Sequence, residues 1–581
     1  MNTEGMIHQG LRSIIMEIFK FTKKAGALSV LKKEIEGITL KGTSGIAHTR
    51  WATHGAPTDN NAHPFLSFNS SVTVVHNGII ENYKALRQSL SEKGYAMESE
   101  TDSEVIAHLI ELFTVNNPHW TFNELVAYLA ETLKGAYALL IQFVNKPNEI
   151  YGLRFECPLA YVQTPTTVAI SSDIASLIGY DRNINILRDG QAVHLTLDTE
   201  DLINFDSSEV DCLHVNVDWD VKAAEKLGYD YFLRKEIAEQ PTSVRGLKNT
   251  LMEKVNEIDE FITSVNPDAI IFIACGSASY SCVFATVFAR NIELKQRVSW
   301  EIGSEFRYNP PIINEKTLVI GMSQSGETAD TVSALRYAKL KGAKIISVIN
   351  VVGSTISMIG DLTLNLSAGP EVAVPSTKAV INQFIAAVFL IEVLRQQKRE
   401  ALKQWLVSIE ELEVGIEKII EMEEDIKNYA KLLAGHQNMF VVGRGLDYPT
   451  SLEGALKLKE TAYIHAEAMY AGEFKHGSIS LIEYGMPVLI LLGDESVAVK
   501  TVINAEEVAT RGGQLLVIDS LDGECFDFSC DVSYIKIPPL KKPFNLIAQI
   551  VVLQLLAYHA GLHRNINVDK PRNLAKSVTV E

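Results

Sequence analysis

Hydrophobic and polar residues follow two different patterns along the chain. Between about residues 42 and 206, short apolar runs are separated by Asn, Gly and Asp, as in strands joined by turns. The clearest runs are residues 72–76, 136–143 and 167–171. We therefore expect an α+β domain in the first part of the chain.

The second pattern begins near residue 269, where continuous apolar runs lead directly into helical segments. The runs 269–275, 317–322 and 345–350 are apolar throughout, as in a parallel sheet covered by helices on both faces. After a polar helical connection at 395–434, similar runs return at 439–442, 487–492 and 514–518. The two halves share little residue identity, so we predict a duplicated, doubly wound α/β architecture rather than a sequence repeat.

A charged stretch at residues 218–239 marks the change between the two patterns. The chain has 581 residues, about four times a ~150-residue domain, so several domains are expected. We place the α+β domain at 1–225, a linker at 226–245, α/β domains at 246–400 and 401–565, and a C-terminal tail at 566–581.

Composition and charge narrow the class of protein. Apolar residues make up 47% and charged residues 21% of the chain, which is ordinary for globular proteins. The net charge of −18 disfavours nucleic acid and anionic membranes as partners. The first residues lack a secretory signal, and polar residues interrupt the apolar stretch 546–562, so we expect a buried helix there and a cytoplasmic protein. The six cysteines form no metal-binding or disulfide pattern, so no metal, cofactor or disulfide is expected.

The strand 317–322 ends in a hydroxyl-rich turn that could bind phosphate. Ser323, Ser325 and Thr328 would donate from their hydroxyls, and Gly326 would let the backbone approach the ligand. An ordinary Ser/Thr helix cap would look the same. A second strand end with Ser277, in the same sheet, favours a ligand, and the loop 368–378 could add further donors.

A second group of residues could perform acid–base chemistry. Glu453, Lys457 and Glu460 have the spacing of one helical face, and the rest of that helix is apolar. A solvated ion-pair face is the alternative to a stripe that lines a cleft. Of the two nearby histidines, His465 is expected in a helical run, whereas His476 is expected in a loop and is the better acid–base candidate.

At these residues the sequence resembles the isomerising glutamine:fructose-6-phosphate aminotransferases, also called glucosamine-6-phosphate synthases. The resemblance spans nearly the whole chain. It is carried by segments 48–55, 76–78, 101–105, 235–237, 323–328, 453–460, 475–477 and 569–581.

The resemblance implies an N-terminal nucleophile (glutaminase-type) amidotransferase domain followed by two sugar isomerase (SIS) domains. It implies that fructose 6-phosphate is aminated with glutamine, or with ammonia, to glucosamine 6-phosphate on the way to UDP-N-acetylglucosamine, by a homodimer without cofactor. Lys576 would form a Schiff base with the sugar, Glu460 would transfer the proton, His476 would help to open the ring, and Glu453 and Lys457 would support Glu460. The phosphosugar would be bound by Ser277, Ser323, Gln324, Ser325, Thr328, Val374 and Ser376.

The glutaminase part departs from the family pattern. There the nucleophile is an N-terminal cysteine, whereas the first cysteine of this sequence is Cys157. A truncated gene model, an enzyme that uses free ammonia and a degenerate paralogue would each explain this, and we expect no glutamine hydrolysis by this chain. Pro375, where the family usually has Ala, leaves the sugar preference open. The remaining glutamine-site residues would be Arg50, Trp51, Thr53, His54, His63, Asn77, Gly78 and Asp102.

Two other functions compete with this interpretation. One is a different SIS-domain enzyme, such as a fructosamine phosphate deglycase or an ammonia-dependent isomerase. The other is a non-catalytic phosphosugar sensor. A sensor needs neither proton-transfer groups nor a Schiff-base lysine, so the presence of Glu460, His476 and Lys576 argues against it.

Overall fold

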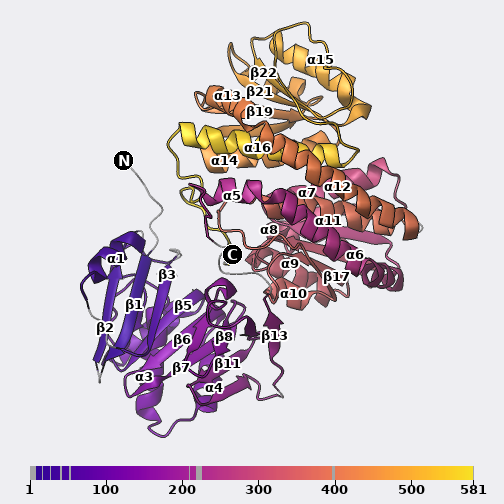
Figure 1. Cartoon of the computed structure of the whole chain (residues 1–581). Helices are drawn as coiled ribbons and strands as arrows, with labels where there is room; N and C mark the ends of the chain where they lie inside the picture. Colours follow the sequence, from indigo (N-terminus) through magenta and orange to yellow (C-terminus); the bar gives the residue numbers. More distant parts are fainter. Residues whose placement is uncertain are drawn as a thin grey trace. The chain divides into compact units, whose positions relative to one another are not determined.

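The computed structural model describes residues 8–15, 18–26, 28–38, 42–50, 54–208, 210–217, 225–395 and 399–579. The chain divides into two compact units at residue 221 (Figure 1). Unit 1 comprises residues 1–221, and unit 2 continues through residue 579. Each unit has hydrophobic clusters of its own.

Unit 1 is built on antiparallel sheets, as the alternation of short apolar runs predicts. The six-stranded sheet has the order β12(Glu200–Asn204)-β11(Gln191–Leu195)-β7(Lys146–Phe155)-β6(Gly135–Phe143)-β5(Val72–Ile80)-β4(Phe65–Leu66). The four-stranded sheet has the order β13(Leu213–Asn216)-β10(Asn183–Ile186)-β8(Ala160–Gln163)-β9(Val168–Ser171). The three-stranded sheet has the order β2(Ile18–Lys24)-β1(His8–Ile15)-β3(Gly45–Arg50).

Helices cover part of these sheets and complete an α+β domain. α3(Glu104–Asn116) and α4(Phe122–Thr132) bury apolar side chains in the same cluster as β5 and β6. A capping box begins α4, because Thr121 accepts from the Glu124 backbone N–H while the Glu124 carboxylate accepts in return. α1(Leu28–Ile35) and α2(Tyr83–Glu92) are the other helices in the described part of unit 1.

Unit 2 contains two parallel five-stranded sheets, so the predicted duplicated architecture is confirmed. The first has the order β15(Arg297–Ile302)-β14(Ala269–Ala274)-β16(Thr317–Ser323)-β17(Lys344–Ile349)-β18(Leu362–Asn365). The second has the order β20(His465–Tyr470)-β19(Asn438–Gly443)-β21(Pro487–Leu492)-β22(Gln514–Asp519)-β23(Ser533–Lys536). In each sheet the first strand along the chain has later strands on both sides. The chain therefore reverses its direction of progress across the sheet at β14 and at β19. Ligands of doubly wound sheets bind beside this reversal, at the carboxyl ends of the strands.

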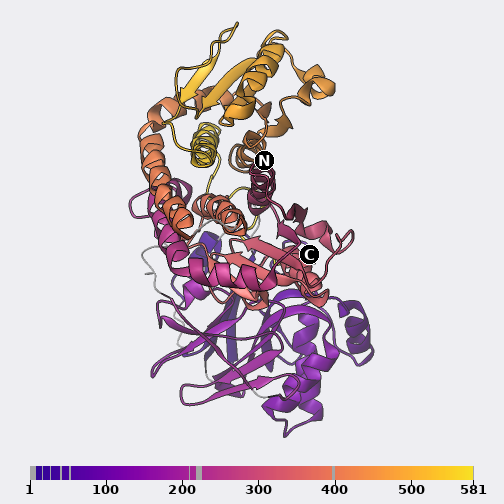
Figure 2. The same ribbon diagram turned by 90° about the vertical axis from the view of Figure 1, so that its right-hand side faces the viewer.

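Helices bury both faces of these sheets, and one hydrophobic cluster runs through both α/β domains. α6(Gln240–Val265) and α12(Arg399–Glu421) lie side by side, as Figure 2 shows, and Lys248 pairs with Glu410 between them at 2.6 Å. Other helices of unit 2 are α7(Ser277–Asn291), α8(Gly303–Phe306), α9(Ala329–Leu340), α10(Thr355–Ile359), α11(Lys378–Leu394), α13(Glu423–Leu433), α14(Asp447–Ala462), α15(Ala498–Ala509) and α16(Phe544–His563).

α16 corresponds to the apolar stretch for which the sequence predicts a buried helix. By length and composition it could cross a membrane, with a mean hydropathy of 1.5 over an 18-residue window. However, 89% of that window is buried inside the protein, as in the core helix of a globular domain. The predicted buried helix is therefore confirmed.

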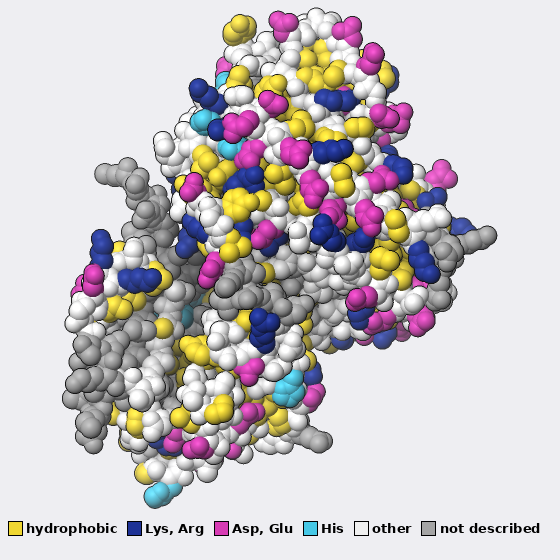
Figure 3. Space-filling model, in the orientation of Figure 1, with side chains coloured by type: hydrophobic (Ala, Val, Ile, Leu, Met, Phe, Trp, Pro, Cys, Tyr) yellow, Lys and Arg dark blue, Asp and Glu magenta, His cyan; other side chains and the backbone are white. Residues whose placement is uncertain are grey.

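The region expected to form a linker, 226–245, contains α5(Phe232–Ala238) and the start of α6. Leu233, Ile237 and Val244 lie in the main hydrophobic cluster of unit 2. On the face shown in Figure 3, acidic and basic side chains are interspersed, with hydrophobic side chains between them.

Candidate functional site

The hydroxyl-rich turn lies at the carboxyl end of β16, where the sheet topology places a ligand. Ser323 is buried, and its Oγ accepts from the Gly326 N–H at 3.0 Å and lies 3.2 Å from Thr328 Oγ1. Ser325 Oγ accepts from the Glu327 N–H at 3.2 Å. Gly326 has φ +69°, and a Cβ there would lie 1.9 Å from Ser354 Oγ, so the turn requires glycine.

The C-terminal tail lies against this turn. The Ser577 hydroxyl donates to Ser325 Oγ at 3.0 Å, and the Val578 carbonyl accepts from the Ala329 N–H at 3.1 Å. Ala329 is the first residue of α9, so the tail occupies one of the amides that begin this helix. The tail is thus in direct contact with the residues expected to bind a phosphosugar.

A second point of attachment lies earlier in the tail, at Asp569. Its carboxylate accepts from the N–H groups of Phe232 and Leu233, at 2.9 and 2.8 Å, at the beginning of α5. Its backbone carbonyl accepts from the Val374 N–H at 3.0 Å. One tail residue thus joins α5 to the loop that precedes α11.

The three residues expected on one helical face come from α14. The Lys457 ammonium lies 2.5 Å from Glu460 Oε2 and 3.5 Å from Glu453 Oε1. Glu453 and Lys457 are fully buried, whereas the Glu460 side chain is 18% exposed and is the member of the group that a ligand can reach. The solvated-face alternative is excluded by this burial.

Burial also sets the charges within this group. It raises the pKa of Glu453 to about 7, with the nearby ammonium of Lys457 acting in the opposite direction. Burial disfavours the charged form of Lys457, but the carboxylates of Glu453 and Glu460 outweigh it and hold the lysine pKa above its usual value. Lys457 therefore remains an ammonium that fixes Glu460.

Tyr280, on α7, was not identified from the sequence. Burial, together with the charges of Glu453 and Glu460, raises its pKa to about 12. Tyr280 therefore lies within electrostatic range of the α14 group. It is three residues after Ser277, a spacing that places both on one face of α7 and could have indicated it.

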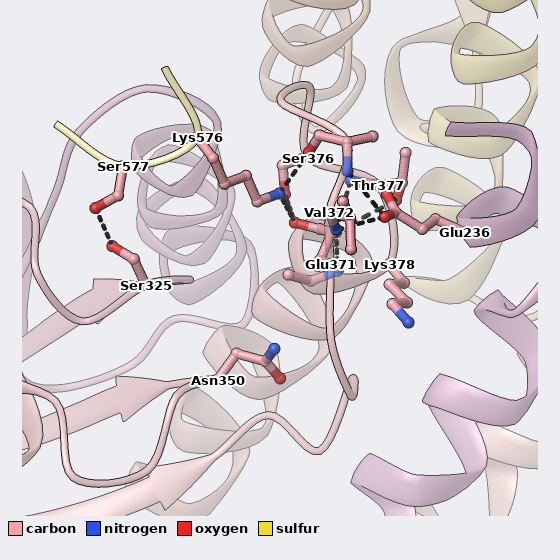
Figure 4. A network of polar contacts seen from close by, with 12 residues as sticks. Glu236, Ser325, Asn350, Glu371, Val372, Ser376, Thr377, Lys378, Lys576 and Ser577 are labelled. Atoms are coloured by element: carbon pink, nitrogen blue, oxygen red, sulfur yellow. Dashed lines mark hydrogen bonds and ion pairs between the residues drawn. The ribbon is translucent and has the colours of Figure 1, made fainter. Parts of the chain in front are cut away.

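Lys576 lies against a carboxylate that the sequence also did not single out. Its Nζ donates to Glu371 Oε2 at 2.5 Å and to the Ala373 carbonyl at 2.9 Å (Figure 4). The Ser376 hydroxyl donates to the same Glu371 oxygen at 3.2 Å. Across the described ranges of unit 2, no ion pair joins Lys576 to Glu460, although Glu371 adds to the field that raises the pKa of Lys457.

The remaining candidates of unit 2 divide into two sets. Ser277 and Gln324 are half-buried at the ends of β14 and β16. His476 is exposed in the 3-10 helix η3(Phe474–His476) and makes no side-chain contact with Glu460 in the part of the chain that the structure describes. The expectation that His465 lies in a helix is wrong, because α14 ends at Ala462 and His465 begins β20.

Unit 1 brings together most of the expected glutamine-site residues. His48 Nε2 lies 2.7 Å from Asn77 Oδ1, and the rings of His48 and His63 stack with their centroids 3.9 Å apart. His63 Nδ1 accepts from the His76 backbone N–H at 3.2 Å. Burial lowers the pKa of His48 to about 4 and also lowers the pKa values of His63 and His76, so all three are neutral near pH 7.

The neighbouring backbone is held by charged side chains. Arg50 is buried and donates to the carbonyls of His54 and Gly55. Asp102 Oδ2 accepts from the Ile80 N–H at 2.9 Å, two residues after Gly78. Gly78 has φ +125°, and a Cβ there would lie 2.0 Å from the Ala136 carbonyl. Trp51 and Thr53 lie outside the described residues.

Cys212, Cys275, Cys282, Cys525 and Cys530 are free thiols. In unit 1, Cys157 is buried, and burial raises the pKa of Cys212, which disfavours a reactive thiolate. Burial likewise raises the pKa values of Cys275, Cys282 and Cys530 in unit 2. None of these five cysteines has the environment of an activated nucleophile.

The antiparallel unit and the duplicated α/β unit define the class of protein. The family model described as a glutamine amidotransferase domain matches residues 48–179. The family model of the SIS domain matches twice, at residues 265–393 and 432–564. The chain therefore combines an amidotransferase domain with two SIS domains.

Comparison with individual proteins makes the assignment specific. The chain is 40% identical to the isomerising glutamine–fructose-6-phosphate aminotransferase of Clostridium tetani, over 99% of this chain and 96% of the relative. It is 38% identical to the protein of the same name from Thermococcus kodakarensis, over 97% of this chain and 94% of the relative. The chain belongs to the family of isomerising glutamine–fructose-6-phosphate aminotransferases, and the deglycase and sensor alternatives are not favoured.

Solved structures agree for unit 2. The C-terminal domain of the glucosamine-fructose-6-phosphate aminotransferase from Francisella tularensis is 28% identical, with a TM-score of 0.54 over 60% of this chain and all of that chain. Tagatose-6-phosphate ketose/aldose isomerase from Escherichia coli shares the fold at 15% identity, with a TM-score of 0.51 over 59% of this chain and 95% of that chain. Unit 2 thus has the fold of phosphosugar isomerases.

Proposed function

We propose that this protein converts fructose 6-phosphate to glucosamine 6-phosphate, by amination coupled to isomerisation. The observation that carries the proposal is the contact of the tail bearing Lys576 with the Ser323–Thr328 turn, in a chain that belongs to this family. This contact brings an amine-bearing segment to a phosphate-binding turn. The turn and the tail would together hold both ends of an open-chain sugar phosphate.

The chemistry follows from the groups at hand. The Lys576 amine would condense with the C2 ketone and release water, and ammonia would then displace the lysine amine, so that the nitrogen kept on C2 comes from ammonia. The resulting imine would act as an electron sink when a proton leaves C1. Glu460 would move that proton between C1 and C2, since it is the accessible carboxylate of the α14 group. Lys457 would hold Glu460 in place, and Glu453 would limit the motion of Lys457.

Nitrogen would come from glutamine or from ammonia. Unit 1 has a group of residues that could bind glutamine and an oxyanion, formed by its buried histidines with Asn77 and Gly78. Cys157 and Cys212 do not supply an activated thiol to it. We therefore propose that the 581-residue chain aminates the sugar with ammonia and does not hydrolyse glutamine.

We further propose a homodimer located in the cytoplasm that binds neither nucleic acid nor membranes. Exposed apolar side chains around His476 support the dimer: Tyr470 is 43%, Leu481 59% and Tyr484 97% exposed. A second copy could cover them and bring His476 to a sugar. Light scattering at micromolar concentration tests this, and a monomer would contradict it.

The activity itself is tested with the purified chain, fructose 6-phosphate and ammonium chloride, with sugar phosphates measured by mass spectrometry. We expect glucosamine 6-phosphate, and no product from a Lys576→Ala variant that still binds the sugar. If the variant forms product at the wild-type rate, the assigned chemistry is wrong.

A further inference from the structure

Two buried carboxylates lie beside Lys576, and the chemistry described above uses neither of them. The side chain of Glu371 is fully buried, and Glu236, on α5, is 1% exposed. Burying a carboxylate destabilises the fold unless the carboxylate is paired, so two buried carboxylates close together indicate a specific role. Figure 4 shows both converging on the loop that precedes α11.

The two oxygens of Glu371 have different partners. Oε1 accepts from the backbone N–H groups of Thr377 and Ala379, at 2.9 and 3.1 Å, and thereby caps the start of α11. Oε2 accepts from Lys576 Nζ at 2.5 Å and from the Ser376 hydroxyl at 3.2 Å. One oxygen is thus fixed by the backbone, while the other holds the reactive amine beside a candidate sugar-binding hydroxyl.

Glu236 holds the same loop from the other side. Its Oε1 accepts from the N–H groups of Val372 and Ala373, at 2.6 and 3.0 Å. The Thr377 hydroxyl lies 3.2 Å from both Glu236 Oε2 and Glu371 Oε1, but it has only one proton to donate. Burial and the charge of Glu371 raise the pKa of Glu236 to about 7, so near neutrality a protonated Glu236 can donate to Thr377, which in turn donates to Glu371.

We propose that Glu371 is a positioning residue for Lys576: it holds Nζ beside Ser376 until the sugar arrives. This inference rests on the proposed function, since it assigns a partner to the imine-forming lysine. The charged groups that face Glu371 are Lys576 from the tail, Glu236 from α5 and Lys457 from α14.

The charge distribution agrees with this role. Burial alone would raise the pKa of Glu371, but the ammonium of Lys576 and the donated hydrogen bonds lower it to about 2. The group is therefore an anion at all working pH values. This anion keeps Nζ in place through a charge-assisted hydrogen bond.

The test compares Glu371→Gln with the wild type in the full chain. Fructose 6-phosphate is added with sodium cyanoborohydride at fixed pH, and reduction of the imine on Lys576 is followed by mass spectrometry. At saturating sugar the variant should be trapped about tenfold more slowly, because Nζ is less well placed, while the Kd for fructose 6-phosphate changes little.

Glu392→Gln is the matched control, since Glu392 is a buried carboxylate at the other end of α11, 3.8 Å from Arg395. It should show the wild-type trapping rate. If Glu371→Gln folds and is trapped at the wild-type rate, the inference is wrong. A purely structural cap would lower the free energy of unfolding without lowering the trapping rate of the folded protein. If the wild type itself is not trapped at Lys576, the proposed function fails instead.

Should Glu371→Gln not fold, Glu371→Asp provides the second variant. The shorter side chain keeps the negative charge but draws the carboxylate away from Nζ. We expect a lower trapping rate at an unchanged Kd for fructose 6-phosphate. An unchanged trapping rate would overturn the positioning role.

Discussion

Lys457 lies 2.5 Å from Glu460 within one helix, and this ion pair fixes the carboxylate that we expect to move the proton. Lys457 is buried and Glu460 is partly exposed, so a buried ammonium holds a carboxylate that a sugar can reach. Glu453 contacts the same ammonium from the buried side, at 3.5 Å. Lys457 therefore holds Glu460 directly, and Glu453 acts on Glu460 only through Lys457.

The first prediction concerns Glu460→Gln. The amide cannot accept the C1 proton, so amination and isomerisation should fall by at least about 100-fold while the Kd for fructose 6-phosphate changes little. Calorimetry gives the affinity and mass spectrometry gives the product. Glu467→Gln, at an exposed position of β20, serves as the control and should be fully active. Equal rates for Glu460→Gln and the wild type would refute the role of Glu460.

The second prediction concerns the turn after β16. Ser323→Ala combined with Thr328→Ala removes two hydroxyls, and the Kd for fructose 6-phosphate should rise roughly 10- to 100-fold, at about 1–3 kcal/mol in total. Ser264→Ala, near the end of α6, removes a hydroxyl that bonds only within its own helix and should leave the affinity unchanged. Unchanged affinity in the double variant would mean that the hydroxyls only cap α9.

The third prediction concerns the attachment of the tail. Asp569→Ala removes both acceptors for the α5 amides, so the free energy of unfolding should fall by about 0.5–2 kcal/mol. Asp569→Asn keeps one acceptor, so its free energy of unfolding should fall less than that of Asp569→Ala. Urea denaturation measures both variants. The affinity for fructose 6-phosphate should fall as well, because the Asp569 carbonyl accepts from the Val374 N–H and so helps to hold Val374 in place. Wild-type stability and affinity in Asp569→Ala would exclude this bracing role.

The fourth prediction follows from a buried acid in the second α/β domain. Asp447 accepts from the N–H groups of Gly493 and Asp494, at 3.1 and 3.0 Å, and burial raises its pKa to about 7 from an ordinary value near 4. Between these values the folded state binds a proton that the unfolded state lacks. Asp447 therefore stabilises the fold at low pH, and this contribution is lost as the pH rises towards 7.

Asp447→Asn mimics the neutral acid and should remove that contribution to the pH dependence. The difference in the free energy of unfolding between the wild type and the variant should change by up to about 1.4 kcal/mol per pH unit between pH 5 and 7. The variant should become more stable relative to the wild type as the pH rises. Chemical denaturation at pH 5, 6 and 7 measures it. A constant difference across this range would show that Asp447 is ionised in the folded protein throughout.

Much of the fold follows from local pattern. The inner strands of both parallel sheets, such as β16 and β21, are buried on both faces, so short apolar runs such as 317–322 are sufficient to predict them. The edge strands β15 and β20 contain exposed polar residues and do not form such runs. The spacing of Glu453, Lys457 and Glu460 likewise predicts a shared helical face. His465 was misplaced because Tyr463 adopts φ +51° and ends the helix, which an apolar run does not reveal.

The contacts around Lys576 could not be predicted in this way. Glu371 is 205 residues from Lys576, and Asp569 caps a helix 336 residues before it. Such pairings depend on how the elements pack and leave no periodic signal in the sequence. The lysine itself was identified only through family resemblance, since a lone lysine near a chain end is unremarkable.

We infer that this chain aminates fructose 6-phosphate at the site formed by the α14 carboxylate and the tail lysine. The formation of glucosamine 6-phosphate from fructose 6-phosphate and ammonium chloride by the purified chain tests this, with glutamine as the parallel nitrogen source. We expect product with ammonia, none with glutamine, and none with ammonia in Glu460→Gln. Absence of both product and isomerisation in a folded sample that binds the sugar would rule out this amination.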